Sequence, residues 1–77
     1  MIWNGTDLGS IEVVDVTKTK IDFQLMSVDI SKLPTEGMKP NNTGLALDTL
    51  GAGSSAFVLD TGDVYVFHGQ SKTWNKL

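Results

Sequence analysis

The last third of the chain, residues 54–77, carries the feature that most restricts the fold. Segments 56–59 (AFVL) and 64–67 (VYVF) are rich in β-branched and aromatic residues, which suits strands on a pleated, buried surface. Residues 60–63 (DTGD) have turn composition, and the pattern predicts a type I turn that Gly62 closes as a G1 bulge. A second break at 68–72 precedes a short strand over 73–77. We therefore predict a three-stranded antiparallel meander.

Both strong segments are apolar at every position, although side chains of a strand alternate between two faces. One face of each strand therefore covers the core of the domain. The other face needs a second layer, supplied either by residues 1–50 or by another chain.

The upstream sequence also favours strands. Residues 11–16 (IEVVDV) predict a strand whose alternation slips at Val13 and Val14, which indicates a bulge or a buried central position. Residues 21–25 alternate cleanly. Over residues 26–30 the alternation of apolar and polar residues continues but shifts by one position. This pattern fits one long bulged strand or two strands with a bend better than a helix. Asn4-Gly5 near the start is a strong turn signal.

The expected fold is a small, mostly β single domain. It consists of N-terminal strands over 1–30, a Gly/Pro-rich loop or arm over 31–53, and the C-terminal meander over 54–77. Within the arm, residues 45–50 (LALDTL) form an apolar island that fits a short strand or a single helical turn.

Composition and charge argue against several classes of function. The 77 residues suit one domain, and the chain has no cysteine for a disulfide or a thiolate metal ligand. The net charge is −3 with no arginine, which disfavours nucleic-acid binding. The six lysines are scattered, and no apolar run approaches the roughly 20 residues of a membrane span. The first residues lack the pattern of a signal peptide.

Two features suggest chemistry only weakly. Asp60-Thr61-Gly62 matches the catalytic triplet of aspartic proteases, but Asp63 follows where that family usually has Ala or Ser. His68 is the only histidine, and metal sites need several converging ligands. We expect a turn in both places, and we predict no catalytic residue, no metal and no cofactor.

Four aromatic residues are the candidates for recognition, because such side chains dominate protein interfaces and sugar-stacking platforms. They are Trp3, Tyr65, Phe67 and Trp74. The alternative is that they fill a small core, and we expect this for at least two of them.

The C-terminal 45 residues also carry a recurring pattern. Its parts are residues 33–35 (LPT), the step 53–55 (GSS), Asp60-Thr61-Gly62, the aromatic strand 64–67, and the ending 72–77 (KTWNKL). As a package this resembles small virion proteins of tailed bacteriophages, especially those of Gram-positive hosts. Residues 41–52 form a longer insertion than that pattern has.

The resemblance implies a non-enzymatic structural protein that is capsid-, fibre- or tail-associated and binds other virion subunits. It implies many copies or a homo-oligomer, located in the virion and made in the host cytoplasm, with neither nucleic acid nor membrane as a partner. The alternative is a small ligand-binding module for host-surface carbohydrate, with Tyr65, Trp74 and Trp3 as stacking platforms.

Overall fold

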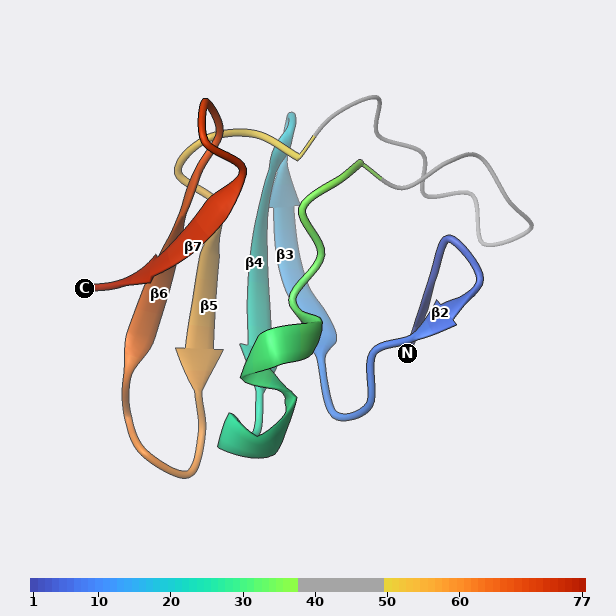
Figure 1. The fold of residues 1–77 in the computed structure, drawn as a ribbon, viewed down its shortest axis with the longest axis vertical. Helices are drawn as coiled ribbons and strands as arrows, with labels where there is room; N and C mark the ends of the chain where they lie inside the picture. The colour runs from blue at the N-terminus through green and yellow to red at the C-terminus, as the bar shows by residue number, and fades with distance from the viewer. Residues whose placement is uncertain (38–49) are drawn as a thin grey trace.

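The computed structural model describes residues 1–37 and 50–77, and the fold is mostly β (Figure 1). One sheet has the strand order β3-β4-β5-β6-β7, and a small hairpin pairs β1 with β2. The elements are β1 (Ile2–Trp3), β2 (Thr6–Asp7), β3 (Glu12–Thr17), β4 (Lys20–Leu25), the 3₁₀ helix η1 (Ser27–Lys32), β5 (Ser55–Val58), β6 (Val64–His68) and β7 (Thr73–Lys76).

The large sheet is mixed. Strand β4 pairs in parallel with β5, whereas β3–β4, β5–β6 and β6–β7 are antiparallel. A parallel pair needs a crossover connection, and this one begins with η1, which lies in front of the sheet in Figure 1. The last three strands are therefore continuous with the upstream ones, because β5 lies between β4 and β6.

Local sequence accounts for the turns and for one irregularity. Asn4 and Gly5 have φ values of 50° and 84°, the positive pair that a tight hairpin turn requires, and Gly62 has a φ of 76°. The register of β3 against β4 shifts between Val13 and Asp15. The predicted irregularity at Val13 and Val14 is thus a bulge, and it leaves Val14 exposed.

The prediction of strand structure over residues 26–30 is wrong, because residues 27–32 form η1. Side chains from elsewhere bind the backbone where β4 would continue. Ser10 Oγ accepts the N–H of Met26 at 2.9 Å, and Asp60 accepts the N–H of Ser27 at 2.8 Å. These bonds replace strand pairing at this point. The apolar residues therefore do not alternate between core and solvent, and Val28 is exposed.

The core lies on one face of the sheet. Alternate residues of β4, β5 and β6 point into it, and residues of the N-terminal hairpin, the following loop and the segment after η1 close it. The buried apolar residues are Trp3, Leu8, Ile11, Ile21, Phe23, Leu25, Leu33, Leu50, Ala56, Val58 and Phe67. Burying these side chains is the main favourable term in folding.

Part of the predicted arm packs against this core. Leu33, Pro34 and Gly37 are buried, and so is Leu50 at the other end. Residues 38–49 lie outside the described part of the structure, and most of the predicted loop and residues 45–49 of the apolar island lie there too.

Candidate functional site

The sheet face opposite the core carries an apolar patch over β5 and β6. Phe57 is 45% exposed, and Leu59 continues the same alternation at 50% exposed. Val64, which pairs directly with Phe57, and Val66 are half-buried. We call Phe57, Leu59, Val64 and Val66 the open face. Large side chains of this kind rarely group on the surface of a soluble monomer without a role in binding.

Polar groups border the open face. Strand β4 places Gln24 beside Phe57 and Asp22 beside Ser55 in the parallel register. The hydroxyl of Ser55 donates a hydrogen bond to Asp22 Oδ1 at 2.8 Å. An apolar centre with a polar border is the usual organisation of a protein–protein interface.

The four predicted aromatic residues do not lie on this face. Trp3 and Phe67 are 4% and 1% exposed, and Tyr65 and Trp74 are half-buried against the same core. Phe23 lies between the two indoles, with ring centroids 5.6 Å from Trp3 and 5.9 Å from Trp74, both edge to face. Trp3 and Phe67 therefore present no free ring surface to a ligand.

Both indoles also hold the segment after η1. Trp3 Nε1 donates to the carbonyl of Glu36 at 3.1 Å, and Trp74 Nε1 donates to the carbonyl of Pro34 at 2.8 Å. The ammonium of Lys72 lies 3.1 Å from a carboxylate oxygen of Glu36. We call the two indoles the tryptophan clamp, since they fix residues 34–36 over the core. The sequence signals the buried aromatic residues but not their carbonyl partners.

A cleft of about 270 Å³ lies between the β1–β2 hairpin and the segment that the clamp holds. Among residues 1–37 and 50–77, two charged side chains line it, those of Lys32 and Glu36. Both are already paired, Lys32 with Asp29 at 3.2 Å and Glu36 with Lys72. The described lining of the cleft therefore offers no unpaired charge to orient a ligand.

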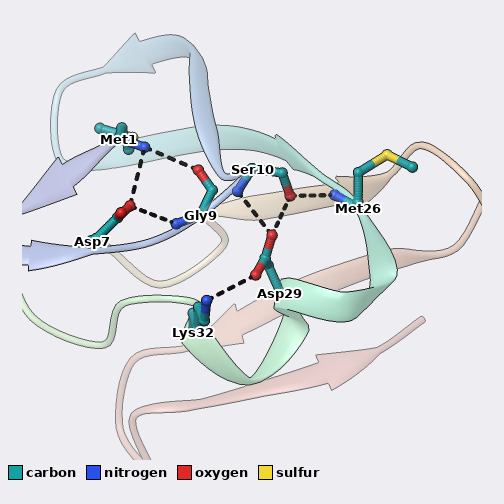
Figure 2. A network of polar contacts seen from close by, with 7 residues as sticks. All are labelled: Met1, Asp7, Gly9, Ser10, Met26, Asp29 and Lys32. Carbon is teal, nitrogen blue, oxygen red and sulfur yellow. Dashed lines mark hydrogen bonds and ion pairs between the residues drawn. The ribbon is translucent and has the colours of Figure 1, made fainter.

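Asp29 is the centre of a polar network that sequence reasoning missed (Figure 2). Its carboxylate accepts the N–H of Ser10 at 2.8 Å and the hydroxyl of Ser10 at 2.6 Å, and Lys32 approaches from the other side. These hydrogen bonds, foremost that from the Ser10 hydroxyl, lower the pKa of Asp29 to about 2. Gly9 makes room for the carboxylate, because a Cβ there would lie 2.6 Å from Asp29 Oδ1.

Asp60 of the protease-like triplet has a structural partner. It accepts the backbone N–H of Ser27 at 2.8 Å and the Ser27 hydroxyl at 2.6 Å. The hydroxyl bond, then the backbone bond, lowers the pKa of Asp60. An aspartic protease needs carboxylates that share a proton, and the environment of Asp60 instead favours the ionised form.

His68 lies exposed at the end of β6. Within residues 1–37 and 50–77, no group of three or more histidine or acidic side chains is arranged to hold a metal ion. In the same ranges, no helix has the length and apolar character to span a membrane.

Comparisons with known protein families, with curated proteins and with solved structures gave no match to this chain. The open face and its border are therefore the feature on which a functional argument rests.

Proposed function

We propose that this chain is a non-enzymatic structural protein of a bacteriophage virion, capsid-, fibre- or tail-associated, and that it binds other virion subunits. The observation that carries the proposal is the open face, with Phe57 and Leu59 about half exposed in so small a domain. Its burial against a neighbouring subunit would add apolar contact that a chain of this length lacks on its own. The resemblance of the C-terminal segment to small virion proteins supports the same function.

The organisation proposed for this role is a C-terminal meander over residues 54–77, preceded by a Gly/Pro-rich arm over 31–53. The meander supplies Phe57, Leu59, Val64 and Val66, which are the contacts of the open face. Since 38–49 lies outside the described residues, the proposal depends on the meander and not on the arm.

Carbohydrate recognition receives less support from the aromatic residues. A stacking platform needs an exposed ring face, and Trp3 is buried while Trp74 packs on Phe23 and Phe67.

The test is peptide mass spectrometry of gradient-purified particles of the phage that encodes the chain. The proposal predicts peptides of this protein in intact particles at a fixed ratio to the major capsid or tail protein. Their absence from particles, together with abundant protein in the infected-cell lysate, would refute it.

A further inference from the structure

Strand β7 is an edge of the sheet, and its free backbone groups can be identified. Phe67 donates its N–H to the Ser54 carbonyl at 2.8 Å and accepts the N–H of Gly53 at 3.0 Å. The backbone groups of Phe67 therefore point toward β5. Its neighbour across β6–β7 is Trp74, so the N–H and C=O of Trp74 point away from β6.

A hydrogen bond at the end of β7 leads independently to the same orientation of its backbone groups. Leu77 donates its N–H to the Val64 carbonyl at 2.8 Å, so alternate residues of β7 bond to β6. Thr73, Asn75 and Leu77 thus direct their backbone groups toward β6. Trp74 and Lys76, which alternate with them, direct theirs away from β6. Among the described residues, β6 is the one strand neighbour of β7. Thr73, Asn75 and Lys76 are exposed, so this edge is accessible.

The opposite edge is protected against pairing. Strand β3 carries the bulge between Val13 and Asp15, whereas no register shift interrupts the pairing of β7 with β6. A bulge is a common device that prevents the addition of another strand. We therefore expect two copies to pair β7 with β7. Because the same strand is used in both copies, the result is a closed two-fold dimer rather than an open chain of sheets.

We infer that a second copy of this chain pairs with it antiparallel through β7, with Asn75 opposite Asn75 of the other copy. This inference deepens the proposed function, on which it rests, by naming one of the bound subunits. In this register Trp74 of each copy lies opposite Lys76 of the other. All the outward backbone groups of β7 then face one another in two hydrogen-bonded pairs.

The competing register is less favourable. In that register Trp74 lies opposite Trp74 of the other copy. Lys72 of each copy then lies opposite Lys76 of the other, which sets like charges directly across the junction. Lys72 also has a φ of 53° and is not in strand conformation, so that pair cannot form ladder bonds. The chosen register instead sets the aliphatic stem of Lys76 opposite Trp74 of the other copy, and it leaves the Lys76 ammonium with its partner Asp63, 3.5 Å away in its own chain.

The pairing has a structural consequence for the open face. A two-fold axis perpendicular to the sheet keeps each face on its own side, so the two open faces become one continuous surface. Phe57 and Val64 of both copies then lie on the same side, available to a further subunit.

Cysteine cross-linking tests the register, because the natural chain has no cysteine. In the variant Asn75→Cys, the Cα atoms of residue 75 in the two copies would lie about 4.5 Å apart across the two-fold axis, within the range of a disulfide. In the control Thr73→Cys, also exposed on β7, the two positions would be roughly 13 Å apart along the strand. We expect mild oxidation to cross-link Asn75→Cys at least tenfold faster than Thr73→Cys or Glu12→Cys. Equal rates at positions 73 and 75 would overturn the register.

Mass in solution tests the pairing itself. Light scattering across a concentration series should approach twice the chain mass of 8.3 kDa. Lys76→Pro removes one outward N–H without removing a bond to β6, and should return the mass to 8.3 kDa with an unchanged circular dichroism spectrum. Lys76→Ala keeps the N–H and should still dimerise. A monomer at every concentration, or a dimer unaffected by Lys76→Pro, would refute edge pairing. Either result leaves the proposed function to be decided separately, by the presence of the chain in purified particles.

Discussion

Asp60 and Ser27 are joined by two hydrogen bonds, from the Ser27 N–H at 2.8 Å and from its hydroxyl at 2.6 Å. The pair connects the β5–β6 turn to the first residue of η1. Together with the bond from the Met26 N–H to Ser10, it ends β4 and starts the turn of the chain across the core face.

Removal of this connection should destabilise the fold in a graded way. Ser27→Ala loses the hydroxyl bond alone, whereas Asp60→Ala loses both bonds. We expect both variants to melt below the wild-type chain, with Asp60→Ala the lower of the two, when thermal unfolding is followed by circular dichroism. Thr61→Ala in the same turn is the control, because it removes only one longer hydrogen bond, from the Asp63 N–H at 3.3 Å, and leaves both bonds between Asp60 and Ser27 in place. Melting of Asp60→Ala at the wild-type temperature would show that the pair is not structural.

The second prediction concerns pH. The folded pKa of Asp29 is about 2, below the ordinary value of 3.8 that applies in the unfolded chain. Because the folded pKa is the lower one, the stabilisation is fully present above about pH 4 and is lost as the pH falls toward 2. Urea unfolding at several pH values should show the free energy of unfolding decreasing across this window.

Asp29→Asn should reduce the slope of that dependence, since an amide does not titrate, and the part that remains includes the contribution of Asp60, whose pKa is also lowered. The control is Asp15→Asn, which changes an exposed carboxylate on β3. If Asp29→Asn and the wild-type chain lose stability with the same slope between pH 4 and 2, the network around Ser10 is not the source.

The tryptophan clamp gives a third prediction. Trp74→Phe keeps an aromatic ring but leaves the Pro34 carbonyl without its donor, and Trp3→Phe does the same to Glu36. Each should lower the free energy of unfolding by about 1 kcal/mol, measured in urea. Because both indoles hold one segment, the double variant should depart from the sum of the two losses. Strict additivity would mean that the two bonds act independently.

Phe23 and Phe57 form a matched pair on opposite faces of adjacent strands. Phe23→Ala opens a cavity in the core and should cost about 3–5 kcal/mol, enough to unfold a domain of this size. Phe57→Ala should cost less than about 1 kcal/mol, because that ring is already half in water. Circular dichroism and urea unfolding distinguish them, and equal losses would mean that Phe57 is part of the core.

The strands could be predicted from sequence because their signals are local. Alternation marks β4, the slip at Val13 and Val14 marks the bulge, and Asn4-Gly5 marks the first turn. The 3₁₀ helix η1 could not be predicted in this way. The groups that end β4 and start η1 are Ser10, 16 residues before Met26, and Asp60, 33 residues after Ser27. The apolar pattern of 26–30 contains no trace of either partner.

The exposed apolar face of the sheet was predicted in part. The apolar character of both strand faces follows from composition, and Phe57 and Leu59 are indeed exposed. The expectation that at least two of the four aromatic residues fill the core is confirmed by Trp3 and Phe67, but the sequence did not indicate which of the four these would be. Tryptophan and phenylalanine serve cores and interfaces alike, and the residue type alone does not separate the two roles.

The measurement that tests the central claim most directly is incorporation of an open-face variant into particles. A phage lacking the gene is complemented with the wild-type chain, with Phe57→Lys, or with the control Val14→Lys, which adds the same charge at an exposed residue of edge strand β3. All three chains should fold, as checked by circular dichroism. We predict that wild-type and Val14→Lys chains are recovered in purified particles and that Phe57→Lys is not. Incorporation of Phe57→Lys at the wild-type level would contradict the proposal that the open face binds other virion subunits.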